Sequence, residues 1–278
     1  MGASVTMSSP TSSALGASDL IVPDWPQPAN VKAFFTTRAG GVSVNHDLTN
    51  RAGLNDFASL NLGRSAGDAP EAINENRRRV AALLPRAPKW LNQVHGNRVV
   101  IADDVINLAE DVKADAVATS TVNIPCAIMV ADCLPVLFCD DTGQHVAAAH
   151  AGWRGLAAGV LENTVAAMSA PPAQIMAWLG PAIGPAAFEV GDDVRDAFLS
   201  QDLRTAPCFV PRGNDHPHKF MADIYALARL RLACAGITRV YGGEFCTFSE
   251  PSRFFSYRRE GKIGRKTGRM AGVIWIER

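Results

Sequence analysis

The sequence predicts a mixed α/β (α+β) fold, built as a single layered α/β domain with mixed sheets. Two observations support this class. Short, dense apolar runs of strand length alternate along the chain with stretches of helical periodicity, and a length of 278 residues suits one large domain. A third observation narrows the choice, because the chain has neither a regular strand-helix-strand repeat nor a GxGxxG turn. The absence of both features argues against a Rossmann fold.

The N-terminal segment differs from the rest of the chain in composition. Residues 1–20 are rich in Ser, Ala, Gly and Thr and lack a sustained apolar stretch, and the first basic residue is Lys32. A secretory signal needs both a basic and an apolar region, and a mitochondrial presequence needs arginines. We therefore expect residues 1–20 to be a disordered tail and residues 21–278 to form a single catalytic domain.

Charge and cysteine content limit the partners and the compartment. Lys+Arg and Asp+Glu both number 27, so the formal net charge is zero and no long-range field attracts nucleic acid or an anionic membrane. The most apolar run, residues 125–139, is interrupted by Asp132 and two prolines and is too short to span a bilayer. Six cysteines without an export signal indicate reduced thiols. We expect a cytoplasmic protein with no nucleic-acid or membrane partner.

In the N-terminal half, the run from Val31 to Thr37 is typical of a β-strand, and it enters a glycine-containing loop over residues 38–43. Asp68 and Glu71 have the spacing of a capping box, which predicts a helix over residues 69–84.

The centre of the chain predicts a group of buried strands followed by a helix. Three apolar runs, Ala127–Ala131, Val136–Phe138 and His145–Ala149, are short and flanked by Pro, Asp and Gly, as buried strands are. From Leu156 to Met168 the apolar residues have helical spacing, and two prolines at 171–172 end that helix. The remaining expected elements are a strand at Ile175–Leu179, a turn-rich loop at 180–185, a helix capped by Asp223 that runs to Ala235, and strands at Val240 and Val273–Ile276.

Three segments place a metal-ligating side chain beside a chain reversal: His95, Cys133 and His150. A thiolate and two imidazoles give zinc three protein ligands and one open position, which is the arrangement of catalytic zinc sites. The intervals of 38 and 17 residues are too long for a compact finger motif, so the ligands must meet through the fold. Two other interpretations remain open. Cys133 and His150 can form a nucleophile and its base, and each residue can simply be buried in the core.

Three arginines lie in loops next to glycine or at a helix start: Arg38, Arg154 and Arg258. Their planar, bidentate donors suit phosphate, and the N–H groups of the Gly152–Gly155 turn can add to such a site. The alternative is that these arginines pair with carboxylates or lie in solvent. A further basic cluster is either a substrate rim or a solvated face, and it contains Arg253, Arg258, Arg259, Arg265, Lys266 and Arg269.

Seven motifs occur together in this chain, in the following order: TTRxGGVS at 36–43, SLNLG at 59–63, QVHG at 93–96, ADCLPV at 131–136, HAGWRG at 150–155, LGPxIG at 179–184 and FFSYRR at 254–259. With these motifs the chain resembles the YfiH/YlmD family from about residue 31 to the C-terminus. That family is described variously as laccase-domain, polyphenol oxidase-like, peptidoglycan editing factor and zinc-dependent purine nucleoside phosphorylase.

The resemblance implies a metal, zinc or else copper, held by His95, Cys133 and His150. It also implies the use of phosphate to cleave adenosine, inosine, guanosine and methylthioadenosine, together with deamination of adenosine. We accordingly expect a zinc enzyme with purine nucleoside and phosphate as its small-molecule partners. The alternatives are a cysteine hydrolase or amidase that edits peptidoglycan precursors through Cys133 and His150, and a copper-dependent polyphenol oxidase. Residues 44–58 and 262–266 depart from the family pattern and put the substrate preference in question.

Overall fold

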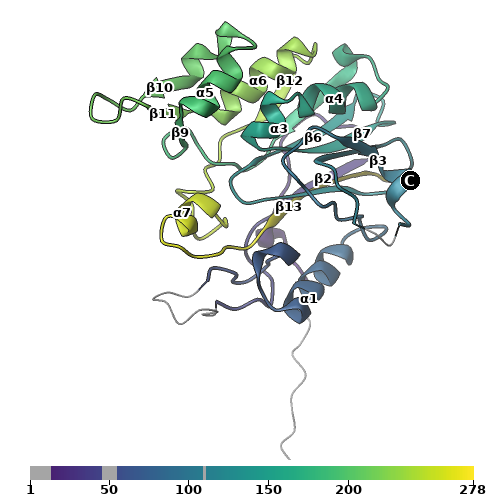
Figure 1. Ribbon diagram of the computed structural model, residues 1–278. Helices are drawn as coiled ribbons and strands as arrows, with labels where there is room; N and C mark the ends of the chain where they lie inside the picture. Colours follow the sequence, from purple (N-terminus) through teal and green to yellow (C-terminus); the bar gives the residue numbers. More distant parts are fainter. Residues whose placement is uncertain (1–13, 46–54, 109–110) are drawn as a thin grey trace, which may run out of the picture.

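The structure, a computed structural model, describes residues 14–45, 55–108 and 111–278 and has the expected mixed α+β class. Its elements form layers (Figure 1). Helices α3, α4 and α6 cover one face of a six-stranded sheet, a four-stranded sheet packs on the other face, and α1 lies beneath the second sheet. These helices are α1 Pro70–Ala81, α3 Trp153–Ala157, α4 Val160–Ala167 and α6 Ile224–Cys234.

The six-stranded sheet is mixed, with the order β12-β8-β6-β7-β4-β3. Its two outer pairs are parallel and its central pairs are antiparallel. The strands are β3 Val99–Ile101, β4 Ala116–Thr119, β6 Leu134–Asp140, β7 Val146–Ala151, β8 Ile175–Leu179 and β12 Arg239–Gly242. The expected strands in the centre of the chain are confirmed.

The four-stranded sheet joins the two ends of the chain. Its order is β1-β2-β13-β5 and all its pairs are antiparallel. The strands are β1 Leu20–Ile21, β2 Val31–Thr36, β5 Cys126–Val130 and β13 Met270–Ile276. The C-terminal strand therefore lies between a strand from the start of the chain and one from its middle.

Side-chain alternation along the strands produces the layers. In β7, Ala147 and Ala149 pack against the helices, whereas Val146 and Ala148 pack against the four-stranded sheet. Phe34 of β2 faces the opposite way from its neighbours and packs in the layer above α1. Both faces of the central strands are buried, which explains why their sequences are almost continuously apolar.

The helices differ from expectation at two points. The single helix expected from Leu156 to Met168 is divided into α3 and α4 at Gly159, which has φ +89°. The expected capping box at the start of α1 is absent, because Asp68 accepts hydrogen bonds from Ser43 Oγ and Asn61 Nδ2 instead. Among the residues that the structure describes, every helix is too short or too polar to cross a lipid bilayer.

The C-terminal half contains a small sheet that the apolar pattern does not predict. Its order is β10-β11-β9, and a short helix, α5, follows β9. The bounds are β9 Glu189–Gly191, α5 Asp192–Leu199, β10 Phe209–Pro211 and β11 Lys219–Ala222. The other short elements are α2 Ala102–Val105, α7 Tyr257–Gly261 and 3-10 turns at Ala17–Asp19, Arg64–Ala66, Pro172–Gln174 and Leu203–Cys208.

The expected disordered tail requires correction where the structure describes it. Residues 1–13 of that tail lie outside the described residues, but Leu15 is 7% exposed and Leu20 pairs with Thr36. Leu15 reaches its site because Gly40 has no side chain, and a Cβ there would lie 2.5 Å from Leu15 Cδ2. A contact between one leucine and a glycine loop leaves no periodic signal in the sequence.

Candidate metal centre

The fold brings together the three side chains predicted as ligands. His95 lies in the turn before β3, Cys133 in the turn between β5 and β6, and His150 near the end of β7. Their potential ligand atoms all lie within 4.8 Å of one another. Cys133 Sγ is 3.8 Å from His95 Nε2, and the two imidazole rings meet edge to face with centroids 4.8 Å apart.

Two turns with unusual backbone geometry present these ligands. His95 has φ +61°, and Asp132, next to Cys133, has φ +87°. Such values are uncommon for residues other than glycine and persist where surrounding contacts fix them. The buried Asp132 carboxylate accepts hydrogen bonds from Thr247 Oγ1 at 2.6 Å, Ser256 Oγ at 3.1 Å and the Arg258 N–H at 2.6 Å. The Cys133 turn is therefore tied to the start of α7.

Two glycines of the HAGWRG segment leave space for the ligands. A Cβ at Gly152 would lie 3.0 Å from both Cys133 Sγ and His95 Cδ2. A Cβ at Gly155 would lie 2.5 Å from the carbonyl oxygen of Gly96, so only glycine lets α3 approach the His95 turn. Without side chains at these two positions, α3 packs closely against the ligand group and leaves the three ligand side chains room to meet.

The centre is polarised toward a thiolate. Burial alone raises the pKa of Cys133, but the charge of His150 and hydrogen bonds with both histidines outweigh burial and lower this pKa to about 6. Burial alone lowers the pKa of His150, but the charge of Cys133 and a hydrogen bond from His150 to Asp115 raise it to about 9. Thiolate is the form of cysteine that binds metals.

The donor set fits one metal ion. A thiolate and two imidazoles match the ligands of zinc, and they also suit copper. Among the described residues, no other group of three His, Cys, Asp or Glu side chains is close enough to hold an ion. His95 is exposed, Cys133 is half-buried and His150 is buried, so the group opens toward solvent on the His95 side. This site can bind a metal and leave one position for another ligand.

Of the three arginines predicted to bind phosphate, Arg258 is joined directly to the centre. Its backbone N–H bonds to Asp132, and its guanidinium lies over the Phe188 ring with Nη1 3.4 Å from the Ala187 carbonyl oxygen. Arg154 is exposed and stacks on the neighbouring Trp153, 4.4 Å from the ring centroid. It lies two residues after Gly152 in the chain, and the structure gives no contact between Arg154 and the ligand group.

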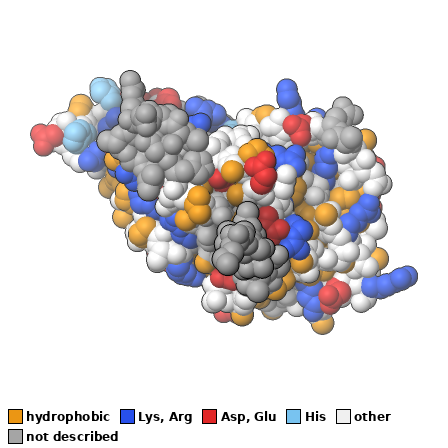
Figure 2. Space-filling model, turned by 90° about the horizontal axis from the view of Figure 1, so that it is seen from below, with side chains coloured by type: hydrophobic (Ala, Val, Ile, Leu, Met, Phe, Trp, Pro, Cys, Tyr) orange, Lys and Arg blue, Asp and Glu red, His pale blue; other side chains and the backbone are white. Residues whose placement is uncertain are grey.

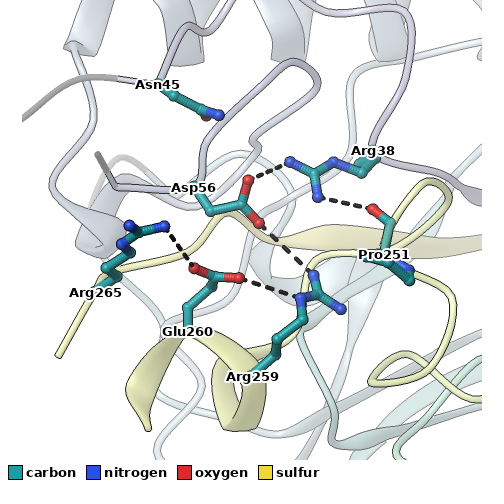
Figure 3. A pocket seen from close by; sticks show the side chains of 7 residues that line it. All are labelled: Arg38, Asn45, Asp56, Pro251, Arg259, Glu260 and Arg265. Atoms are coloured by element: carbon teal, nitrogen blue, oxygen red, sulfur yellow. Dashed lines mark hydrogen bonds and ion pairs between the residues drawn. The ribbon is translucent and has the colours of Figure 1, made fainter. Parts of the chain in front are cut away.

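Arg38 lies in a different place, in a hollow of about 570 Å³ shown in Figure 3. Its guanidinium forms an ion pair with Asp56 and donates to the carbonyl oxygens of Ala58 at 2.8 Å and Pro251 at 2.9 Å. These contacts tie the 44–58 segment to Pro251, and the structure gives no contact between Arg38 and the ligand group. Binding of phosphate by Arg38 stays a prediction.

Arg77 of α1 is a half-buried arginine that is not among those predicted from the sequence. Its Nε donates to the Leu62 carbonyl at 2.9 Å, its Nη2 is 3.7 Å from Met129 Sδ and its guanidinium covers the Trp90 ring. Burial and the charge of Arg64 lower the pKa of Arg77 to about 10. A signal was present, because Arg77 stands on the apolar stripe of the helix between Ile73 and Val80.

Arg269 belongs to the basic cluster noted in the sequence and lies closer to the centre than expected. Its alkyl chain packs on Gly63, and its Nη1 donates to the carbonyl oxygens of Thr267 and Gly268, just before β13. Burial lowers the pKa of Arg269, although the negative charges of Cys133 and Asp132 act to raise it.

The charges on the surface are mixed. On the face in Figure 2, basic and acidic side chains are interspersed among hydrophobic ones.

Comparisons with known proteins identify the family of the chain. A family model described as "Multi-copper polyphenol oxidoreductase laccase" matches residues 32–277. A Pseudomonas aeruginosa protein named as a purine nucleoside phosphorylase is 51% identical over 257 residues, covering 92% of this chain and 98% of that protein. The Escherichia coli purine nucleoside phosphorylase YfiH is 49% identical over 265 residues, covering 93% and 99%.

Solved structures show the same fold. A Neisseria meningitidis protein of the DUF152 family aligns with a TM-score of 0.84 at 50% identity, covering 94% of this chain and 100% of that chain. YlmD from Geobacillus stearothermophilus aligns with a TM-score of 0.78 at 30% identity, covering 95% and 98%.

Proposed function

Since the chain belongs to the YfiH/YlmD family, we propose that it is a zinc-dependent purine nucleoside phosphorylase that also deaminates adenosine. The observation that carries the proposal is the meeting of His95, Cys133 and His150 within 4.8 Å, in a chain about half identical to relatives named as purine nucleoside phosphorylases. The expected nucleosides are adenosine, inosine, guanosine and methylthioadenosine. The six free cysteines support a reducing, cytoplasmic location.

In phosphorolysis, a phosphate oxygen bonds to C1′ of the ribose while the bond from C1′ to the purine nitrogen breaks. The products are the purine base, which takes up a proton, and ribose 1-phosphate. In deamination, water adds at C6 of adenosine and ammonia leaves, which gives inosine.

The metal belongs to the ligand group. Zinc would be held by His95, Cys133 and His150. Copper is the alternative metal, because the matching family model is described as a multi-copper oxidoreductase. When bound at three protein ligands, zinc supplies a Lewis acid with an open position and makes water acidic enough to react near neutral pH. The chain's own contribution is to keep Cys133 as a thiolate and both imidazoles in place.

Arginines supply the expected phosphate contacts. Arg258 is tied to the Cys133 turn, and Arg154 lies exposed in the first turn of α3, two residues after Gly152. Arg269 is a further candidate, because its Nε and Nη2 have no hydrogen-bond partner among the described residues. The charges of Cys133 and Asp132 also act to raise its pKa, which indicates that Arg269 lies near the Cys133 turn. Guanidinium groups bind phosphate with two parallel hydrogen bonds, and they are not needed to activate water.

A second candidate function rests on one observation. Cys133, His150 and Asp115 form a chain of nucleophile, base and orienting carboxylate, with His150 Nδ1 2.8 Å from Asp115 Oδ1. This arrangement suits a cysteine hydrolase that cleaves an amide of a cell-wall precursor. The two functions differ over His95, which a metal requires and a Cys-His pair does not.

The test uses the zinc-loaded chain and adenosine, with products separated by chromatography. We expect inosine when phosphate is absent, and adenine with ribose 1-phosphate when it is present. Substitution by Ala of Arg258, Arg154 or Arg269 at a true phosphate contact slows phosphorolysis roughly ten- to a hundredfold, because a charge-assisted hydrogen bond is worth about 1.5–3 kcal/mol. Deamination is affected far less.

Arg239→Ala is the matched control, because Arg239 pairs with Asp141 at the other end of β6 and should affect neither activity. Arg38→Ala tests the remaining sequence prediction in the same assay. If neither condition gives a purine product and a cell-wall precursor releases an amino acid, the cysteine hydrolase replaces this proposal.

A further inference from the structure

Asp115 immediately precedes β4 and is completely buried. Its only ion-pair partner among the described residues is His150, so neither Lys nor Arg neutralises it there. The carboxylate instead accepts hydrogen bonds from four donors, which all belong to the two histidine segments of the candidate metal centre. We propose that Asp115 is a positioning residue that builds this centre by holding the His150 imidazole and the backbone turn of His95 at once; the inference rests on the metal site of the proposed function.

The first contact fixes the His150 ring. Asp115 Oδ1 is 2.8 Å from His150 Nδ1, and the backbone N–H of His150 donates to the Asp115 carbonyl oxygen at 2.7 Å. A carboxylate at Nδ1 keeps the proton on that nitrogen and leaves Nε2 to face a metal. The two hydrogen bonds fix both the backbone of His150 and the orientation of its ring.

The second set of contacts fixes His95. Backbone N–H groups of Val94, His95 and Gly96 donate to Asp115 at 3.2, 2.9 and 2.7 Å. Consecutive N–H groups that converge in this way form an anion-binding nest. His95 has φ +61°, a conformation that few residues other than glycine adopt, and the carboxylate holds the turn in it. Without this carboxylate, the three converging N–H groups would lose their common acceptor.

The chain contains a matched control for this role. Asp140 is also buried, and it accepts hydrogen bonds from the Gln144 and His145 N–H groups, the His145 ring and Thr142 Oγ1. It stabilises the turn between β6 and β7, where no cysteine or second histidine completes a ligand group within the described residues. Asp115 and Asp140 are therefore alike as buried hydrogen-bond acceptors and differ in whether they orient metal ligands.

The experiment measures the zinc affinity of the full chain by competition with a chromophoric chelator, together with the melting temperature of the metal-free chain. Asp115→Asn keeps the side-chain size but turns one acceptor oxygen into a donor, so it cannot satisfy both histidine segments. We expect zinc to bind roughly 10- to 100-fold more weakly. Asp140→Asn should lower the melting temperature and leave zinc affinity within about twofold of wild type.

A double-substitution cycle separates positioning from general stability. If Asp115 acts by positioning the histidines, Asp115→Asn weakens zinc binding by a smaller factor when His150 is already Ala. Unchanged zinc affinity in Asp115→Asn, an equal loss in Asp140→Asn, an additive cycle, or a wild type that binds no zinc would each overturn the inference. Absence of purine products with normal zinc binding would contradict the proposed function alone.

A readout in the wild type covers the case in which Asp115→Asn does not fold. In the zinc-loaded chain, ¹⁵N NMR of the histidine rings should show a proton on His150 Nδ1. A proton on Nε2 of that ring would contradict the assigned role, because the nitrogen facing Asp115 would then be an acceptor.

Discussion

The β6–β7 pair has similar residues at its two ends and different chemistry. Each end has a cysteine on or next to β6, a histidine on or next to β7, and a buried aspartate that bonds to the histidine Nδ1. One end has Cys133, His150 and Asp115, and the other has Cys139, His145 and Asp140. A pair of carboxylate and imidazole is therefore not enough to make a metal centre.

The two cysteines account for the difference. Cys139 lies within β6 and is fully buried, and burial together with the charge of Asp140 raises its pKa to about 12. Cys133 lies in a turn that points it at two imidazoles, where its pKa falls to about 6. The same residue type is inert inside the strand and polarised in the turn before it, because the thiol lies beside two imidazoles in the turn and is buried beside Asp140 in the strand.

The largest expected effect is loss of metal at one end only. Replacing His95, Cys133 or His150 by Ala should reduce zinc from about one ion per chain to a small fraction, because two ligands bind zinc much more weakly than three. His145→Ala, at the other end, should retain full zinc. Elemental analysis of the purified variants measures this. Full zinc and activity in His95→Ala would favour the Cys133–His150 pair as a nucleophile and base.

The second effect is a difference in titration between the two thiols. In the metal-free chain, the ultraviolet absorbance of thiolate should rise near pH 6 for Cys133, whereas Cys139 stays protonated up to about pH 12. Subtracting the spectrum of Cys133→Ala isolates the first step. A Cys133 that titrates near pH 8.5, as an unperturbed thiol does, would remove the distinction between the two ends.

The same shifts have a consequence for stability. The depressed pKa of Cys133 stabilises the fold at high pH, and this contribution is lost as pH falls through about 6. The raised pKa of His150 stabilises the fold at low pH, and this contribution is lost as pH rises through about 9. Between about pH 6.5 and 8.5 the two slopes oppose each other. The melting temperature of metal-free wild type, relative to Cys133→Ala, should be flat there and fall on both sides.

A smaller effect is expected at Gly152, which borders only the metal end. Its φ of −63° accommodates any residue, so Gly152→Ala introduces no backbone strain. The new methyl would press on Cys133 and His95 at 3.0 Å and should weaken zinc binding several-fold. Gly261→Ala is the control, since its nearest neighbour would be 3.9 Å away. Equal zinc affinity in the two variants would mean that the ligand group is not confined by α3.

The smallest effect belongs to the other end. His145→Ala removes a hydrogen bond to the buried Asp140 and should cost about 1 kcal/mol, which lowers the melting temperature by about 2–4 °C. Activity should not change. Thermal unfolding with a parallel adenosine assay checks this, and loss of purine turnover in a stable His145→Ala chain would show that the two ends are coupled.

The sequence predicts the central strands well because burial on both faces makes them almost continuously apolar, as in β6 and β8. It does not predict the β9–β11 sheet, whose strands are too short for a periodic signal, or the division of α3 from α4 at Gly159. Spacing alone does not join His95, Cys133 and His150, since their proximity depends on two turns and a strand end. The resemblance to a family supplied that connection.

The supporting residues of the site were harder to predict. Asp115 stands next to an apolar strand and gives no sign that it holds the His95 turn and the end of β7. A polar residue on a buried face is therefore the feature to examine first when a site is sought from sequence.

One end of the β6–β7 pair is proposed to hold a single metal through one thiolate and two imidazoles. X-ray absorption spectroscopy at the zinc edge, on the full chain purified without added copper, tests this directly. We expect one sulfur at about 2.3 Å and two imidazole nitrogens at about 2.0 Å, with the sulfur shell absent in Cys133→Ala. A wild-type spectrum with no sulfur, or a sulfur shell that persists in Cys133→Ala, would contradict it.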